Sequence, residues 1–387
     1  MGPNGSGKTT ILEAISLCCH SKSFHESTDS NLIGKEFQTG SSEAVGNKGN
    51  DTFTSEIGSL VSNPGFSVTG FSKEDNGTEF KVTVAFGGSL RAKRITNFSG
   101  KVVKPSELIG RLPLVTLSLD DRELTIGSPE SRRVYLDRVL CQYSKPYYAN
   151  LVEYKKVLRQ RNSLLAKVKK DLPIDSQQYE VWTEKLKELA VPLILARVAL
   201  VEELRPIFKQ YYSYFAPENE NVDIAYQPHF FKEVDSIYEN GVNVFHRNQT
   251  LLSSQLEKEA EEKRSLEKIR GTTLFGPQRD DLIVTLSGEV ARKIASQGQH
   301  KSLLIALKFA ELQLLLEKSA NKPIIILDDI FSELDKIRSE KILGLISDLG
   351  SQTFISTADE SHLSGMDLTN TCIFDVFKGK AEKRENG

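Results

Sequence analysis

The stretch that decides the fold lies at the start of the chain and reads Gly2-Pro3-Asn4-Gly5-Ser6-Gly7-Lys8-Thr9-Thr10. It matches the phosphate-binding loop pattern G-x-x-x-x-G-K-[ST] at every position. Its glycines let the backbone curl so that successive N–H groups point at a β-phosphate. We expect Lys8 to reach the β- and γ-phosphates and the Thr9 hydroxyl to bind Mg²⁺. Residues 11–15 then predict a helix, whose dipole attracts the anion. The loop therefore predicts a nucleotide site rather than a plain glycine-rich turn.

A second half of this site is predicted near the other end of the chain, in the segment Pro323-Ile324-Ile325-Ile326-Leu327-Asp328-Asp329. An apolar strand that ends in two carboxylates is the Walker B arrangement, and it is buried because helices cover both faces of a parallel sheet. We expect Asp328 to hold Mg²⁺, directly or through water, and Asp329 to act as the catalytic group that polarises the attacking water. Such a strand occurs by chance, but seldom together with a phosphate-binding loop.

The composition sets broad bounds on the class of protein. With 387 residues, 39% of them hydrophobic and 26% charged, the chain is long enough for roughly two to three domains. It contains no apolar run of membrane-spanning length and no signal-peptide pattern. The four cysteines have no metal-ligand spacing, and the six histidines are scattered. These features predict a cytoplasmic protein with reduced thiols, no zinc site and no membrane partner.

The net charge of −2 argues against a uniformly basic nucleic-acid binder, but it hides an asymmetry. Between residues 131 and 170, eleven Lys and Arg stand against two acidic residues, and five tyrosines lie among them. Basic side chains attract phosphates and aromatic rings can stack on bases. The stretch is equally typical of a solvated helix face with tyrosines in the core. Both interpretations stay open at this point.

The hydrophobic pattern predicts an α/β fold that is interrupted by helices and then resumes. We expect loops and short strands over 26–76, then a strand over 80–86 with a turn at Gly87-Gly88. Helices should run from about 131 to 213, with Pro192 and Pro206 kinking or interrupting them. The other expected elements are a strand at 112–117, a mixed acidic region at 216–250, a charged helix at 253–270 stopped by Gly271, a strand at 282–286, an amphipathic helix at 299–318, a strand at 323–327 and a helix at 336–348. No long heptad run is present, so the helical insertion is a short lobe rather than a long coiled coil.

Two segments beside Walker B resemble motifs of the ATP-binding-cassette (ABC) ATPases. Ala295-Ser296-Gln297-Gly298-Gln299 resembles their signature motif, and Ser332-Glu333-Leu334-Asp335 resembles their D-loop. The resemblance implies that Ser296, Gly298 and Gln299 reach the γ-phosphate of ATP held by a second subunit, and that Asp335 touches the opposite active site. A capping serine and a surface turn explain each piece, but not the series in this order.

Three longer segments are similar to the RecF family of bacterial DNA replication and repair proteins. They are Gly127-Ser128-Pro129-Glu130-Ser131-Arg132-Arg133-Val134-Tyr135-Leu136-Asp137, Tyr154-Lys155-Lys156-Val157-Leu158-Arg159-Gln160-Arg161-Asn162-Ser163-Leu164-Leu165 and Gly276-Pro277-Gln278-Arg279-Asp280-Asp281. The last segment carries Gln278 where the family has His. The resemblance covers nearly the whole chain.

This resemblance implies an ABC-type ATPase head, a P-loop NTPase built from both ends of the chain, with an inserted helical arm lobe. The expected parts are a first part of the head at 1–130, the arm lobe at 131–270 and a second part of the head with the signature and Walker B at 271–387. It implies ATP and Mg²⁺ as ligands and an ATP-dependent, head-to-tail homodimer. DNA with single-strand/double-strand junctions is the implied partner, together with RecR, RecO and the RecA recombinase that they load. The candidate DNA contacts are Arg132, Arg133, Lys155, Lys156, Arg159 and Arg161.

The sequence departs from the family at two places. Family members carry an "L…NFR" strand and a strand leading into the loop, and neither precedes Gly2 here, so we expect the N-terminal strand or strands of the family to be missing. The second Walker B carboxylate is Asp329 rather than the Glu common in transporters. It is one methylene shorter, which fits slow hydrolysis that resets a switch. Two alternative functions remain: a transporter-type ABC subunit, and an architectural DNA-binding protein without turnover.

Overall fold

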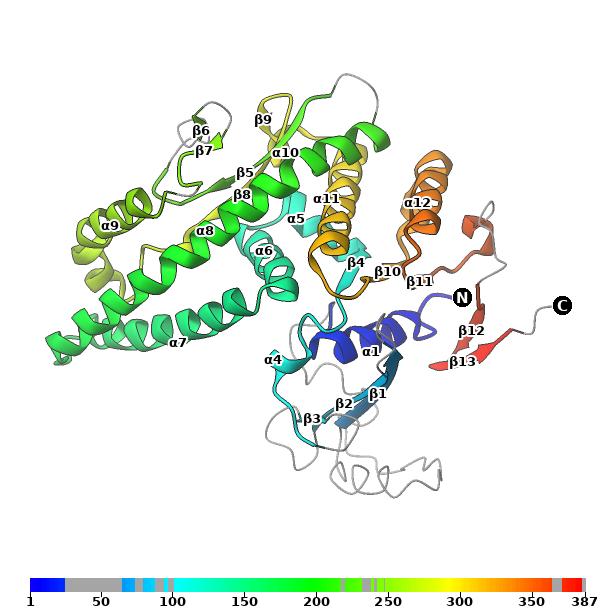
Figure 1. Cartoon of the computed structure of the whole chain (residues 1–387), viewed down its shortest axis with the longest axis horizontal. Helices are drawn as coiled ribbons and strands as arrows, with labels where there is room; N and C mark the ends of the chain where they lie inside the picture. Colours follow the sequence, from blue (N-terminus) through cyan, green and yellow to red (C-terminus); the bar gives the residue numbers. More distant parts are fainter. Residues whose placement is uncertain are drawn as a thin grey trace. The chain divides into compact units, whose positions relative to one another are not determined.

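The phosphate-binding loop belongs to a unit built from both ends of the chain. The computed structural model (Figure 1) describes residues 1–24, 65–73, 79–87, 94–96, 101–216, 220–231, 238–239, 242–246, 248–363 and 371–384. Residues 1–120 and 318–387 form one unit, here called the terminal unit, and residues 121–317 form the middle unit. A head assembled from the two ends is the architecture expected from the motifs. The three-part division at residues 130 and 270 stays a prediction.

The centre of the terminal unit is a parallel sheet of strand order β11-β10-β4. It comprises β4 (Leu114–Ser118), β10 (Ile324–Asp328) and β11 (Thr353–Ser356). The strands are nearly continuous apolar runs, as parallel strands between helices require. The register places Asp328 beside both Ser118 and Ser356, so the carboxyl ends of the three strands are level. Ligands of such sheets bind at that edge.

The terminal unit also contains helices, a second sheet and a hairpin, which come before, between and after these three strands along the chain. Its helices are α1 (Lys8–His20), α4 (Pro105–Leu108) and α12 (Lys336–Leu349). An antiparallel sheet of order β1-β2-β3 is made of β1 (Gly65–Lys73), β2 (Glu79–Gly87) and β3 (Arg94–Thr96). A hairpin of β12 (Phe374–Phe377) and β13 (Lys380–Lys383) comes near the C-terminus.

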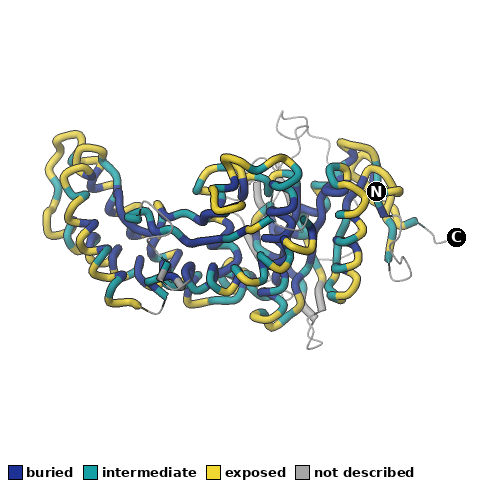
Figure 2. The backbone as a smooth tube through the Cα atoms, turned by 90° about the horizontal axis from the view of Figure 1, so that it is seen from above, coloured by how far each residue is buried: buried dark blue, intermediate teal, exposed yellow. Residues whose placement is uncertain are grey.

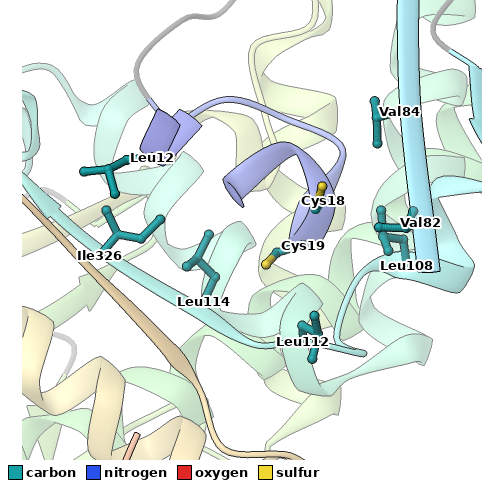
Figure 3. Packing of buried hydrophobic residues seen from close by; sticks show 9 residues of the cluster. All are labelled: Leu12, Cys18, Cys19, Val82, Val84, Leu108, Leu112, Leu114 and Ile326. Atoms are coloured by element: carbon teal, nitrogen blue, oxygen red, sulfur yellow. The ribbon is translucent and has the colours of Figure 1, made fainter. Parts of the chain in front are cut away.

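Helix α1 is fixed by an apolar face that packs between the two sheets. Leu12, Cys18 and Cys19 of the helix share a cluster with residues of both sheets and of the segment that joins them, namely Val82, Val84, Leu114 and Ile326 of the strands and Leu108 and Leu112 between β3 and β4 (Figure 3). Burial raises the pKa of the Cys18 thiol to about 11 and that of Cys19 to about 12. Both cysteines therefore pack as protonated apolar groups. The cluster holds the helix that follows the phosphate-binding loop against the sheet that carries Walker B.

The middle unit is mainly helical. Its helices are α5 (Glu123–Ile126), α6 (Pro129–Tyr143), α7 (Lys145–Val168), α8 (Ser176–Phe215), α9 (Gln249–Arg270), α10 (Ala291–Ile294) and α11 (Gln297–Lys318), whose last residue falls in the terminal unit. Its strands are β5 (Val222–Gln227), β6 (Tyr238–Glu239), β7 (Val242–Asn243), β8 (Asp281–Leu286) and β9 (Glu289–Val290), with sheet order β5-β8-β9 and a separate β6-β7 pair. Along these helices buried residues alternate with exposed ones (Figure 2).

Most of the predicted elements are present. Of the two effects expected at Pro192 and Pro206, a kink or an interruption, the interruption does not occur, because α8 runs through both prolines. Its buried face includes Leu186, Leu193 and Leu204, and this burial outweighs the lost hydrogen bonds, which cost about 3 kcal/mol per proline. The loops expected over 26–76 lie largely outside the described residues, as does part of the Gly87-Gly88 turn; β1, inside that range, is a long strand that the pattern missed. No described helix is long and apolar enough to cross a membrane.

Candidate nucleotide site

The phosphate-binding loop is seated on the C-terminal hairpin. Gly379 donates its N–H to the Ser6 carbonyl at 2.7 Å. Gly7 has a φ of 104°, and a Cβ there would lie 3.1 Å from the Cα of Gly379. A Cβ on Gly2 would lie 2.3 Å from the Val376 carbonyl oxygen. Glycine is therefore required at both ends of the loop, by the backbone angle at Gly7 and by close packing against the hairpin at both positions.

Lys8 lies within the curl of the loop that it follows. Its Nζ donates to the carbonyl oxygens of Gly2 at 2.6 Å and Pro3 at 3.0 Å, and the side chain is buried. Lys8 is also the first residue of α1, whose N-terminus provides the positive end of a helix dipole. One buried ammonium and one helix start therefore converge on the loop, which is the electrostatic arrangement for holding phosphate oxygens.

The two halves of the predicted site meet although they lie far apart in the sequence. The Thr9 hydroxyl donates to Oδ2 of Asp328 at 2.8 Å, across 319 residues. A hydroxyl and a carboxylate are hard oxygen ligands, and Mg²⁺ is typically held by such a pair together with phosphate oxygens and water. No cluster of three or more His, Cys, Asp or Glu that could hold a metal occurs in the part of the chain that the structure describes. Thr9 and Asp328 therefore fit a magnesium ion that is shared with a nucleotide.

Ser356 completes this corner, and sequence reasoning missed it. Its hydroxyl donates to Oδ1 of Asp328 and accepts the backbone N–H of Asp329 at 3.0 Å. Ser356 ends β11, directly beside Asp328 in the parallel register. The sequence feature that could have identified Ser356 is its position as the polar last residue of a short strand, Thr353 to Ser356, that follows Walker B. A single serine of this kind is common, so only the strand pairing identifies it.

Asp329 is held in an unusual backbone conformation. Its φ is 52°, in the left-handed region that non-glycine residues seldom adopt. Its Oδ1 is buried and has no hydrogen-bond partner within the described residues. Backbone strain and an unsatisfied buried oxygen both cost stability and are typical of functional positions. The carboxylate expected to polarise water thus keeps a buried oxygen, Oδ1, without a partner among the described residues.

The signature segment lies in the middle unit at the start of α11. Ser296 and Gln299 form a reciprocal capping box: the Ser296 N–H donates to Gln299 Oε1 at 2.7 Å, and the Gln299 N–H donates to Ser296 Oγ at 3.2 Å. Ser296 and Gln297 are exposed. A Cβ on Gly298 would meet nothing within 4 Å. The segment is therefore a capped helix start that faces outward with open space beside its glycine.

The D-loop residue Asp335 caps a helix of its own unit. Its Oδ1 accepts the Arg338 N–H at 2.9 Å at the start of α12, and its other oxygen pairs with the Arg338 guanidinium. Burial alone would raise the pKa of Asp335, but these hydrogen bonds hold it below its ordinary value. Asp335 therefore caps α12, and contact with an opposite active site stays a prediction.

The three segments that resemble RecF contact one another in the middle unit. Arg132 of the first segment forms a bidentate ion pair with Asp281 of the third, at 2.7 and 2.8 Å. Tyr154 of the second segment donates its hydroxyl to Gln278 of the third. Gln278 stands where the family has His, and its amide oxygen accepts this bond. The segments therefore build one polar core.

Two of the candidate DNA contacts belong to this core, so their expected role does not fit the structure. Arg132 is 4% exposed and Arg161 is 1% exposed. Arg161 pairs with Glu267 at 2.7 Å. Arg133 is half-buried and donates to the Asp280 carbonyl at 2.8 Å. A buried guanidinium whose donors are already bonded has none to offer a phosphate.

The remaining basic candidates lie on the outer face of α7. The side chains of Lys155 and Lys156 are 58% and 60% exposed, and Arg159 is exposed as well. Lys155 pairs with Asp137 at 3.4 Å and Lys156 with Glu153 at 3.6 Å, which are weak surface pairs. Of the five interleaved tyrosines, Tyr135, Tyr147 and Tyr154 are buried. Most of the tyrosines in the basic stretch are therefore core residues, whereas some of its lysines and arginines form an exposed surface.

A second charged cluster surrounds Asp280 of the third segment. Its Oδ1 accepts the backbone N–H of His229 at 3.0 Å and lies 3.4 Å from Nδ1 of the same residue, while Nε2 of His229 pairs with Glu259. Tyr226 donates its hydroxyl to the other Asp280 oxygen. Burial alone would lower the pKa of His229, but Asp280 and Glu259 outweigh it and raise the pKa to about 9. His229 is therefore a charged core residue.

In this chain a phosphate-binding loop meets a Walker B carboxylate beside a parallel sheet, and an inserted helical part carries the signature segment. Together these features define an ATPase head of the ABC type. The fold is shared with SMC head domains: the chain is similar to the Smc head of Pyrococcus furiosus with a TM-score of 0.50 at 16% identity, over 99% of this chain and 88% of that one. This similarity concerns the fold alone.

The chain belongs to the RecF family. The family described as RecF/RecN/SMC N terminal domain matches residues 1–381. The DNA replication and repair protein RecF of Chloroherpeton thalassium is 34% identical over 359 residues, which is 92% of this chain and 87% of that protein. RecF of Geotalea daltonii is 30% identical over 98% of this chain and 91% of its own length. A solved structure of the recombination mediator protein RecF with ATP, in the RecFOR pathway, matches with a TM-score of 0.77 at 26% identity, over 99% of this chain and 91% of that chain.

Proposed function

We propose that this protein is an ATP-switched DNA clamp of recombinational repair and replication-fork maintenance. ATP is held by residues 2–10 with Mg²⁺ between Thr9 and Asp328, and the second copy of the chain covers it with Ser296, Gly298 and Gln299. The single observation that carries the proposal is the 2.8 Å bond between Thr9 and Asp328, because it unites the two sequence halves of a nucleotide site. The relative solved with ATP supports the choice of nucleotide.

The open space at Gly298 supports a partner across the signature. Glycine within a helix costs up to about 1 kcal/mol relative to alanine. Nothing in the described chain lies close enough to require it. A binding surface for another molecule explains the glycine, since a residue without a side chain lets that molecule approach the backbone closely. A phosphate held by a second copy fits, because α11 begins at this point and its N-terminus favours an anion.

DNA binding is assigned to the exposed basic face of α7. Lys155, Lys156 and Arg159 lie within about one helical turn of one another, so they present adjacent charges to a phosphate backbone. The proposed substrate is gapped DNA with single-strand/double-strand junctions. The proposed partners are RecR- and RecO-type mediators and a RecA-type recombinase, in the cytoplasm, with slow hydrolysis at Asp329 resetting the clamp.

Family membership removes the transporter interpretation, and one experiment separates the clamp from an architectural protein without turnover. Affinity for gapped duplex is measured with and without Mg²⁺-ATP, together with phosphate release. The clamp requires ATP to tighten DNA binding in the wild type, with slow phosphate release. Lys8→Ala should lose both effects, because it removes the ammonium that faces the phosphates. ATP-tightened binding with no phosphate release favours the architectural function, and ATP-independent binding contradicts the clamp.

A further inference from the structure

A carboxylate from outside the signature segment fixes its last residue. Gln299 donates its Nε2 to Oε1 of Glu220 at 2.7 Å, across 79 residues. The opposite end of the same amide accepts the Ser296 N–H at 2.7 Å. A carboxylate at neutral pH only accepts hydrogen bonds, so Glu220 requires the nitrogen of the amide to face it and the oxygen to face Ser296. One contact thus sets the orientation on which the capping box depends.

Glu220 is itself held in place by α8. Tyr212, buried near the C-terminal end of that helix, donates its hydroxyl to the other oxygen of Glu220. The same end of α8 lies beside α11 (Figure 1). The two helices pack there, since the rings of Tyr211 and Phe215 each lie 5.5 Å from the ring of Phe309. Both oxygens of Glu220 are therefore bonded within a packed pair of helices.

We propose that Glu220 is a positioning residue for the signature segment, a role that rests on the proposed function above. It acts through Gln299 and does not contact nucleotide. Ser296 and Gln297 are exposed, and an exposed helix start frays when its cap is free to choose between rotamers. With Gln299 anchored, the Ser296 hydroxyl and the first turn of α11 keep one arrangement before a second copy arrives. Pre-arranged donors bind more tightly because less ordering remains to be done.

The test compares Glu220→Ala, Glu220→Gln and the control Glu188→Ala. Glu188 is an exposed carboxylate of α8, and its one ion pair among the described residues is a surface pair with Lys185. Dimer formation is titrated with Mg²⁺-ATP by light scattering, and ATP binding to the monomer is measured at high dilution. Glu220→Ala should raise the ATP concentration for half-dimerisation by about tenfold or more and leave monomer ATP binding unchanged. Glu220→Gln should recover most of this loss, because its amide oxygen still accepts from Gln299. Glu188→Ala should match the wild type.

Hydrogen exchange of the Ser296, Gln299 and His300 amides gives a readout that needs no dimer. Exchange there should quicken in Glu220→Ala and be near wild type in Glu220→Gln, while α12 is unchanged. Wild-type exchange at these amides, or wild-type ATP titration in Glu220→Ala, overturns the role of Glu220. A uniform loss of melting temperature in both Glu220 variants without any change in ATP titration also overturns it. Failure of the wild type itself to dimerise with ATP contradicts the proposed function instead, and the exchange data still decide whether Glu220 holds the cap.

Discussion

Replacing Arg161 with methionine should destabilise the middle unit by about 3–5 kcal/mol, the cost of removing one partner of a buried ion pair. All five N–H donors of Arg161 are bonded. Nε donates to Thr183 at 3.0 Å, Nη1 to Glu267 at 3.1 Å and Thr273 at 2.8 Å, and Nη2 to Glu267 and Tyr179, both at 2.7 Å. Glu267 is fully buried. The variant leaves that carboxylate in the core without its cation.

The expected loss is large enough to measure in the full chain. In a domain of this size, each kcal/mol lowers the melting temperature by about 2–4 °C, so the unfolding transition of the middle unit should fall by about 6–20 °C. Circular dichroism during thermal and urea denaturation provides the assay. Arg159→Met is the matched control, because it removes an exposed arginine one half-turn earlier on α7. Its free energy of unfolding should stay within about 0.5 kcal/mol of the wild type.

The two variants should exchange roles in DNA binding: Arg159→Met, which leaves stability unchanged, should alter it, and Arg161→Met, which lowers stability, should not. For Arg159→Met, the slope of log affinity for gapped DNA against log salt should fall by about 0.9, the value for one lost phosphate contact. Arg161→Met, measured below its unfolding transition, should keep the wild-type slope. Wild-type stability in Arg161→Met, or a reduced salt slope in that variant while it is folded, would refute the assignment of Arg161 to the core.

Three further predictions concern the proposed site and the charged core. Gly298→Ala should stabilise α11 by up to about 1 kcal/mol in thermal denaturation and weaken ATP-driven dimerisation, whereas equal dimerisation would show that nothing approaches the glycine. Asp328→Asn should weaken Mg²⁺-dependent ATP binding and Asp329→Asn should keep ATP bound and trap the dimer, so identical behaviour in binding and phosphate-release assays would contradict the division of roles. The pKa of His229 is raised from 6.5 to about 9 by two buried carboxylates that outweigh burial, so its stabilisation is complete below pH 6.5 and is lost as the pH rises through about 9. His229→Gln should therefore flatten the decline in unfolding free energy between these pH values, and an equally steep decline in urea titrations would count against the cluster.

The nucleotide site could be predicted from the sequence because its chemistry is local. The loop needs glycines and a lysine within nine residues, and the buried strand needs apolar residues followed by a carboxylate. Ser356 could not be predicted in the same way, since its place beside Asp328 depends on which strands are neighbours. The motifs predicted that Thr9 and Asp328 would each hold Mg²⁺, whereas the direct hydrogen bond between the two side chains came from the fold.

The basic stretch shows where a sequence pattern loses information. Arg159 and Arg161 are two residues apart on one helix, and charge counting treats them alike. Helical geometry places one outside and the other against Glu267, a partner 106 residues further on. The continuity of α8 through Pro192 also depends on distant residues, because long-range packing of the helix overrides the local preference of proline to end it.

The central claim is that two copies of this chain close on ATP, with the loop of one facing the signature segment of the other. Its most direct test is the mass of the full chain in solution, measured by light scattering with and without Mg²⁺-ATP for the wild type and Ser296→Arg. The wild type should move with ATP from the 43.2 kDa of one chain to twice that mass. Ser296→Arg should stay at the mass of one chain while binding ATP normally, since the arginine blocks the outward-facing start of α11. A wild-type mass that ATP does not change, or a Ser296→Arg dimer equal to that of the wild type, would contradict the claim.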